Sequence, residues 1–218
     1  GGPQVPVRSE HFFEEYPVVD LLVHYEGEET FADILRRRLD APDNLGYATL
    51  PGLSVRGPDN TCIKTERRPN VKDLSSLPSP YLTGLFDDML KQPYSFQACQ
   101  ETHRGCPYSC TFCDWGSATY TKVRSVEGDR VFDEIEWFGR NKIEFLQNCD
   151  ANFGILKRDD AIVDALIAAK ENYGYPKKFR ASYAKNSNEK IFRLCRKLDA
   201  HDLTKGAMIS LQSMDDDT

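Results

Sequence analysis

The 218-residue sequence lacks both an excess of positive charge and any long apolar run. Its 28 Lys and Arg residues are outnumbered by 34 Asp and Glu residues, which gives a net charge of −6. The chain as a whole therefore offers no general electrostatic attraction to nucleic acid, and no nucleic-acid partner is evident, while a local basic patch stays open. No apolar run approaches the roughly 20 residues needed to cross a bilayer, so we expect no membrane partner.

The sequence also lacks the cysteine pattern of a disulfide-stapled domain. It has seven cysteines, an odd number, and three of them crowd into eight residues, too close to staple a fold: Cys106, Cys110 and Cys113. The others form no second pair of the kind that structural zinc uses: Cys62, Cys99, Cys149 and Cys195. His103, just before the crowded cysteines, leaves a zinc site with three cysteines and one histidine as an alternative. Because cytoplasmic thiols stay reduced, we expect a cytoplasmic protein.

What the sequence does contain is the spacing Cys-x3-Cys-x2-Cys over residues 106–113. Three thiolates this close can hold three irons of a four-iron cluster and leave the fourth iron without a protein ligand. An open iron can bind a substrate or a cofactor. The segment is therefore a candidate for catalysis rather than for simple electron storage.

The cysteine run resembles the motif of the radical S-adenosylmethionine (radical SAM) enzymes, Cys-x3-Cys-x-aromatic-Cys, with Phe112 as the aromatic residue. The flanking residues 101–107 and 113–116 are also similar to those of that family. The resemblance implies a [4Fe-4S] cluster held by the three cysteines. It also implies that S-adenosylmethionine binds the open iron through its amino nitrogen and carboxylate oxygen. One electron from the cluster would then cleave a carbon–sulfur bond and release a 5′-deoxyadenosyl radical.

From residue 94 onward, strand and helix patterns alternate. We expect strands at 94–101, 143–146, 179–183 and 207–211, and helices whose apolar faces lie within 131–138, 162–167 and 191–198. Repeated β-α units predict a parallel sheet that can curl into part of a barrel. In such barrels the chemistry gathers at the carboxyl ends of the strands, and the cysteine loop follows the first strand. The resemblance implies an α/β fold with a partial barrel of the radical SAM type, here residues 94–218, truncated after about four strands.

Residues 1–41 resemble the end of a Rossmann-like cobalamin-binding domain, which precedes the barrel in a large radical SAM subgroup. Residues 42–93 are expected to be a linker, since residues 77–86 resemble the linker of that subgroup. Within it, the apolar segments 53–56 and 62–65 flank Gly-Pro-Asp-Asn and predict a hairpin. The resemblance implies cobalamin as a further cofactor.

The segment after the second predicted barrel strand, residues 147–154, lacks the glycine-rich motif that many family members carry there. By charge, Asp150 is the best acceptor for the methionyl ammonium of S-adenosylmethionine, and Asn152 is the second. The alternative is a simple turn at a helix entry, where Asp and Asn are common.

Other candidate residues follow the remaining strands. Phe112 is expected to pack against the adenine or, alternatively, only against the core. Lys185 and Asn186 follow the third strand and could reach the site. Gln212 and Ser213 follow the fourth strand and could bind the ribose or the carboxylate. Solvated or capping roles remain the alternative for these polar residues.

The sequence thus predicts a radical SAM enzyme of the cobalamin-associated type acting on an unknown substrate. Methylation at an unactivated carbon, ring rearrangement and sulfur insertion all remain open. Such an enzyme needs an electron donor, for example flavodoxin or ferredoxin. The alternative from another class is a binding module without catalysis, stabilised by zinc or by an iron–sulfur cluster.

Overall fold

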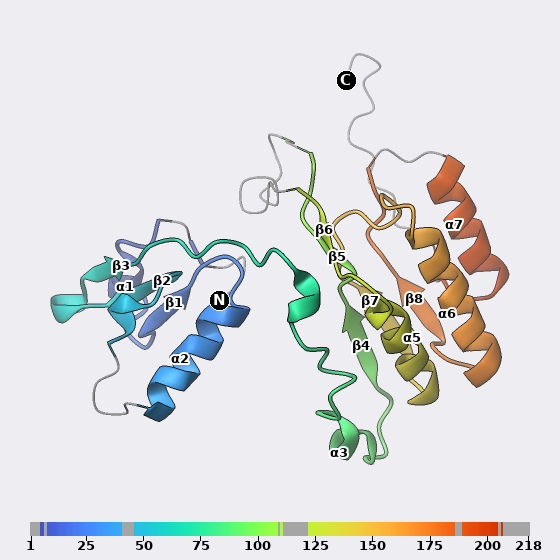
Figure 1. Ribbon diagram of the computed structural model, residues 1–218, viewed down its shortest axis with the longest axis horizontal. Helices are drawn as coiled ribbons and strands as arrows, with labels where there is room; N and C mark the ends of the chain where they lie inside the picture. The colour runs from blue at the N-terminus through green and yellow to red at the C-terminus, as the bar shows by residue number, and fades with distance from the viewer. Residues whose placement is uncertain are drawn as a thin grey trace. The chain divides into compact units, whose positions relative to one another are not determined.

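The computed structural model describes residues 5–6, 8–40, 46–108, 110, 122–185, 189–204 and 206. By its internal contacts the chain divides into two compact units, Gly1–Lys72 and Asp73–Thr218. Figure 1 shows their helices and strands. Within the described part of the chain, no helix is both long enough and apolar enough to span a membrane.

The first unit is a small antiparallel sheet with helices. Its elements are α1 (Phe12–Glu15), β1 (Leu21–Val23), α2 (Glu28–Asp40), the 3-10 turn η1 (Tyr47–Thr49), β2 (Leu53–Arg56), the turn η2 (Pro58–Asn60) and β3 (Cys62–Lys64). The strand order is β1-β2-β3, with Leu22 opposite Ser54 and Val55 opposite Ile63. Its core contains Phe13, Leu22, Ile34, Leu53 and Val71.

The predicted hairpin is confirmed as β2 and β3, and it lies in the first compact unit. β2 pairs with β1, and the Arg56 guanidinium donates to the carbonyls of Phe13, Tyr16 and Val19. These contacts tie the hairpin to residues before position 41, and the first compact unit runs to Lys72. The division into a domain remnant at 1–41 and a linker at 42–93 stays a prediction. The identity of residues 1–41 as the end of a cobalamin-binding domain stays a prediction.

The second unit contains the predicted parallel sheet. Its elements are η3 (Leu74–Ser76), α3 (Asp87–Leu90), β4 (Gln97–Gln100), β5 (His103–Arg104), β6 (Arg124–Ser125), α5 (Arg130–Arg140), β7 (Phe145–Asn148), α6 (Asp159–Tyr173), β8 (Lys178–Arg180) and α7 (Glu189–Ala200). The order β4-β7-β8 is parallel, and β5 and β6 form an antiparallel pair. The alternation that the sequence predicts is confirmed through α7. The expected fourth strand, 207–211, lies outside the described residues.

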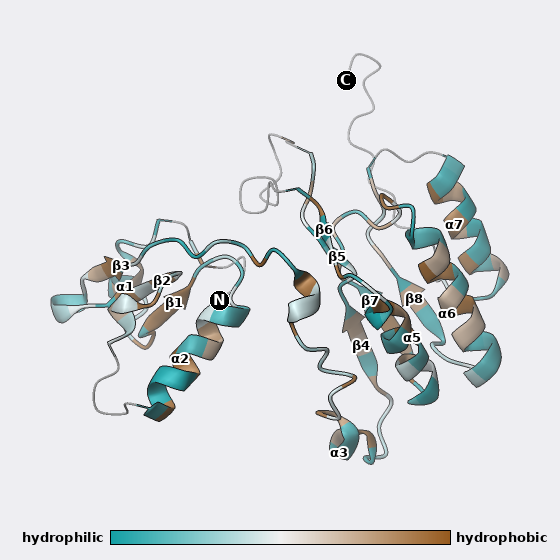
Figure 2. Ribbon diagram, in the orientation of Figure 1, coloured by the Kyte–Doolittle hydropathy of each residue, from teal (hydrophilic) through white to brown (hydrophobic). Residues whose placement is uncertain are grey.

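The core of the second unit lies between this sheet and its helices. Helices α5, α6 and α7 stand side by side along the sheet (Figure 1). Buried and more exposed positions alternate along each strand, and Ala98, Leu146 and Phe179 are the buried apolar members. In Figure 2 the helices carry both hydrophobic and hydrophilic segments, as amphipathic helices do. Complete burial of a side chain such as Leu166 contributes about 1.5–3 kcal/mol.

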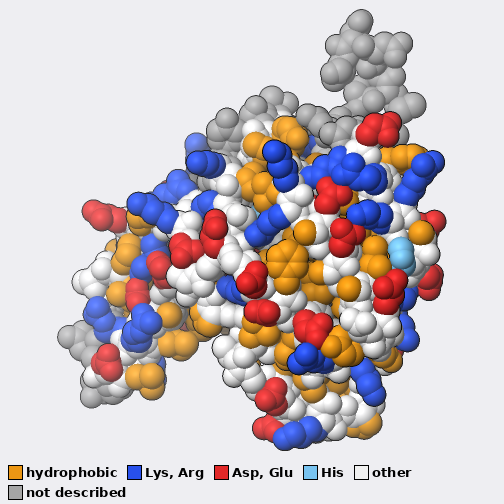
Figure 3. All heavy atoms as spheres, turned by 45° about the vertical axis from the view of Figure 1, so that its right-hand side comes forward, with side chains coloured by type: hydrophobic (Ala, Val, Ile, Leu, Met, Phe, Trp, Pro, Cys, Tyr) orange, Lys and Arg blue, Asp and Glu red, His pale blue; other side chains and the backbone are white. Residues whose placement is uncertain are grey.

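Charged side chains of both signs are interspersed on the face that Figure 3 shows. Two exposed ion pairs join α6 to α7, Arg193 with Asp160 at 2.8 Å and Lys197 with Asp164 at 2.7 Å. Pairs of this kind contribute only about 0.2–1 kcal/mol each, so apolar burial carries most of the stability of this layer.

Candidate functional site

The candidate site forms where neighbouring parallel strands end. Gln100, the last residue of β4, lies opposite Asn148, the last residue of β7. Parallel strands run in the same direction, so the loops that follow them begin at one edge of the sheet. This register brings residues 101–106, which lead into the cysteine run, beside residues 149–154.

Asp150 binds the segment just before the cysteines. Its Oδ1 accepts hydrogen bonds from the backbone N–H groups of Thr102 (2.7 Å) and His103 (3.0 Å). Its Oδ2 accepts from Thr102 Oγ1 (2.5 Å) and Asn148 Nδ2 (2.9 Å), and lies 3.2 Å from His103 Nδ1. The side chains of Asp150 and His103 are both completely buried. Asp150 therefore fixes the backbone three to four residues before Cys106.

The environment of Asp150 favours its ionised form. Burial alone would raise the pKa of this carboxyl group. The hydrogen bonding and charge of His103, together with hydrogen bonds from Thr102 and Asn148, outweigh burial and hold the pKa below its usual value. The carboxylate is a charged acceptor, and such charge-assisted hydrogen bonds are stronger than those between neutral groups.

A second group of contacts closes the base of the loop. The Arg158 guanidinium, at the start of α6, donates to the carbonyls of Thr102 and Val126. Val126 N–H also donates to Thr102 O at 2.9 Å, next to the β5–β6 pair. The two ends of the segment that carries the cysteines are therefore held together. Thr102 lies in the flank that resembles the family, but its structural role and that of Arg158 could not be predicted, because their partners are distant in sequence.

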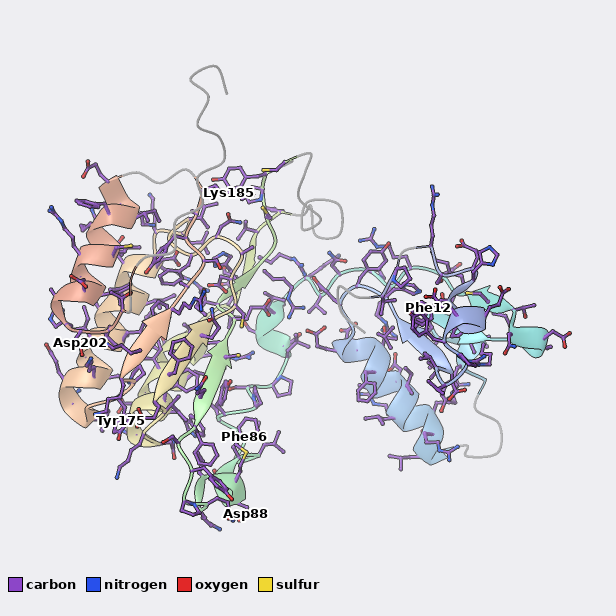
Figure 4. All side chains as sticks on the ribbon, turned by 180° about the vertical axis from the view of Figure 1, so that it is seen from behind. Phe12, Phe86, Asp88, Tyr175, Lys185 and Asp202 are labelled. Carbon is purple, nitrogen blue, oxygen red and sulfur yellow. The ribbon has the colours of Figure 1, made fainter. Side chains whose placement is uncertain are left out.

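Two of the three predicted cluster ligands lie in the described part of this loop. Cys106 is buried and Cys110 is half-buried, and both are free thiols. Gly105, before them, has a φ of 112°, a region that favours glycine. Lys185 Nζ lies 3.4 Å from Cys110 Sγ, and Figure 4 labels this lysine. Cys113 lies outside the described residues, and among the residues described no group of three or more His, Cys, Asp or Glu side chains is placed to bind a metal.

Asn152 is the second polar residue that the sequence placed at this edge. It is 1% exposed, and neither its Oδ1 nor its Nδ2 has a hydrogen-bond partner within the described structure. A buried amide without partners is rare and requires an explanation, such as a bound water or ligand. Thiols in the loop and an unsatisfied buried amide after the neighbouring strand fit a site for a thiolate-bound cluster with a polar cofactor. Phe112, Asn186, Gln212 and Ser213 lie outside the described residues.

Comparison with known proteins identifies relatives over the whole chain. No family model matches. The cobalamin-dependent radical SAM methyltransferase TokK of Streptomyces tokunonensis is 46% identical over 224 residues, covering 100% of this chain and 32% of TokK. The 2-(S-pantetheinyl)-carbapenam-3-carboxylate methyltransferase of Streptantibioticus cattleyicolor is 44% identical over 225 residues, covering 99% of this chain and 32% of that enzyme.

Among solved structures, the radical S-adenosylmethionine methyltransferase TsrM of Kitasatospora setae matches with a TM-score of 0.61 and 17% sequence identity. The match covers 93% of this chain and 39% of TsrM. At that identity the match supports the fold alone, and the α/β class is confirmed. The chain spans about a third of the length of the curated relatives it matches. The predicted resemblance is confirmed: over its full length the chain is homologous to proteins that include TokK, a cobalamin-dependent radical SAM methyltransferase.

Proposed function

We propose that this chain is the cluster-binding part of a cobalamin-dependent radical SAM methyltransferase. The observation that carries the proposal is the cysteine loop at the carboxyl edge of a parallel sheet, in a chain 46% identical to TokK. Under this proposal Cys106, Cys110 and Cys113 bind a [4Fe-4S] cluster. The described strands β4, β7 and β8 would form the first part of a partial barrel.

When bound, the cluster supplies the electron that cleaves S-adenosylmethionine reductively. The chain's own residues hold and orient the groups around it. Asp150 and Arg158 fix the base of the loop, and the buried position of Cys106 limits access of water. A one-electron donor such as flavodoxin or ferredoxin is a required partner in this proposal.

Asp150 and Asn152 remain our candidates for the methionyl ammonium of S-adenosylmethionine. The contacts favour different roles for them. The Asp150 carboxylate already accepts hydrogen bonds on both oxygens, which supports a role in positioning the loop. The Asn152 amide has an unused carbonyl oxygen at the same edge, which supports direct contact with the ammonium after a small local adjustment.

The reaction class is proposed from the relatives. Both are named as methyltransferases, and TokK is named as cobalamin-dependent. Of the reactions left open by the sequence, methylation of a carbon atom in a small-molecule substrate is therefore the one we propose, with cobalamin as a further cofactor.

The first test is metal analysis after anaerobic reconstitution with iron and sulfide. We expect about four irons and four sulfides per chain. Cys106→Ala and Cys110→Ala should each lose most of both. Cys195→Ala is the matched control, since this half-buried thiol lies on α7, outside the loop. A Cys106→Ala, Cys110→Ala double variant that keeps an intact cluster would exclude the assignment.

One observation bears on the zinc alternative. His103 Nε2 is buried and has no hydrogen-bond partner among the described residues, while its Nδ1 faces Asp150. A histidine held this way by a carboxylate is a common zinc ligand. Tight binding of one zinc per chain, lost in His103→Gln, together with no iron after reconstitution, would favour the binding module over the enzyme.

A further inference from the structure

We propose that the Lys185 ammonium donates a hydrogen bond to Cys110 Sγ and raises the reduction potential of the cluster that this thiolate holds. The inference rests on the proposed function, because it concerns the same cluster. It assigns a positioning role to a residue outside the cysteine motif. The contact that carries it is the 3.4 Å distance from Lys185 Nζ to Cys110 Sγ, between residues 75 positions apart.

The backbone places Lys185 at the edge where the cysteine loop begins. Beyond the end of β8, parallel pairing continues through a bridge between Phe153 and Tyr183. Phe153 N–H donates to Ser182 O, and Ala184 N–H donates to Phe153 O, both at 2.9 Å. Tyr183 is buried and its ring lies 6.1 Å from that of Phe153. The chain leading to Lys185 is therefore held against the segment after β7 that contains Asp150.

The charge of the lysine sets the direction of the effect. Reduction adds one negative charge to a cluster that its thiolate ligands already make negative. A nearby ammonium stabilises the more negative state, and a hydrogen bond to a ligand sulfur acts in the same direction. Both effects make reduction easier. For an enzyme that must accept an electron before it can cleave its cofactor, this is the useful direction.

The experiment is a potentiometric titration of the reconstituted protein, with the reduced cluster detected by electron paramagnetic resonance. Lys185→Met removes both charge and hydrogen bond, Lys185→Gln keeps a neutral donor, and Lys185→Arg keeps the charge. Lys91→Met is the matched control. Lys91 is exposed at the end of α3 and pairs with Asp88 at 2.7 Å. Figure 4 shows Asp88 and Lys185 at opposite ends of this unit.

We expect the reduction potential of the cluster to shift to more negative values in Lys185→Met and to shift less in Lys185→Gln. In Lys185→Arg and Lys91→Met it should match the wild type.

Reduction potentials of Lys185→Met and Lys185→Gln equal to the wild type would overturn the inference. Loss of the cluster in those two variants but not in Lys185→Arg would support it, because the charge would then be needed to hold the thiolate. Loss in all three would overturn it. A wild-type protein without iron would instead defeat the proposed function, so the two failures are distinguishable.

Discussion

At the scale of single residues, the site depends on one buried carboxylate. Asp150 accepts hydrogen bonds from Thr102, His103 and Asn148, and its low pKa keeps it charged at neutral pH. Burying a charge is unfavourable unless the charge is paired and hydrogen-bonded, and both conditions are met here. The residue therefore couples strand β7 to the segment that leads into the cysteine loop.

Replacing this carboxylate should destabilise the second unit. Asp150→Asn keeps one oxygen for the N–H groups of Thr102 and His103, but it removes the charge and puts an N–H group opposite Asn148 Nδ2, which is also a donor. We expect the free energy of unfolding to fall by about 1–3 kcal/mol at neutral pH. Asp164→Asn makes the same chemical change in the exposed pair with Lys197 and should cost no more than about 1 kcal/mol. Equal effects of the two substitutions would contradict the role of Asp150.

The same carboxylate predicts a pH dependence with a definite sign. Its pKa in the folded protein lies below the ordinary value of 3.8, so its stabilisation is present above that value and is lost as the pH falls through the folded pKa. The difference in unfolding free energy between the wild type and Asp150→Asn should therefore shrink between about pH 4 and more acidic conditions. Denaturant unfolding over a series of pH values measures it. A difference that stays constant down to acid would contradict the prediction.

The amino-acid sequence alone predicted only part of this site. The position of Asp150 and Asn152 at the carboxyl edge followed from the strand pattern, and so did that of Lys185. The partners of Asp150 could not be predicted, because Thr102 and His103 lie 47 to 48 positions away and meet it only in one strand register. Arg158 could not be recognised either, since its acceptors are backbone carbonyls that any sequence supplies.

At the scale of elements, apolar periodicity predicted the order of strands and helices but not every boundary. The strand expected at residues 143–146 is found at Phe145–Asn148, because Ile143 is buried in the turn after α5, where its N–H donates to Phe138 O at 3.0 Å. An apolar residue in the sequence does not show whether it will be buried in a turn or in a strand. The hairpin β2–β3 was predicted from its turn residues, but pairing with β1 needed the structure.

The close approach of α7 to the loop after β7 is a prediction at this scale. Gly154 has a φ of 94°, and a Cβ added there would lie 2.1 Å from Ile191 Cδ1 on α7. We expect Gly154→Ala to reduce the free energy of unfolding by about 1–3 kcal/mol through overpacking, in addition to backbone strain. Thermal or denaturant unfolding measures the loss.

A matched glycine separates the two causes. Gly128 also has a positive φ, 69°, but nothing lies within 4 Å of the position of its added Cβ. Gly128→Ala should therefore show backbone strain alone. Adding Ile191→Val to Gly154→Ala removes the colliding methyl group and should recover part of the loss, which a double-mutant cycle would quantify. If the cycle gives no coupling between positions 154 and 191, the packing explanation is incorrect.

At the scale of the whole molecule, the chain has two units with separate cores. The cysteine loop and its supports all belong to the second. Cluster loading should therefore slow amide hydrogen exchange in residues 97–108 and 145–154, where local opening would release the ligands. Strands β1, β2 and β3 should exchange as before. Hydrogen-exchange mass spectrometry with and without the cluster tests this, and equal protection of both units on loading would contradict it.

The long sequence separation of the contacts at the cysteine loop has a consequence for protein synthesis. Lys185 follows Cys110 by 75 residues, which takes roughly 4–15 s at translation rates of about 5–20 residues per second. During that interval the nascent chain already contains its cysteines, but the residues that later surround them have not yet been synthesised. Exposed thiolates are open to oxidation and to the wrong metal. If the proposed cluster is bound, we therefore expect its insertion after the chain has passed Lys185, with the thiols kept reduced until then.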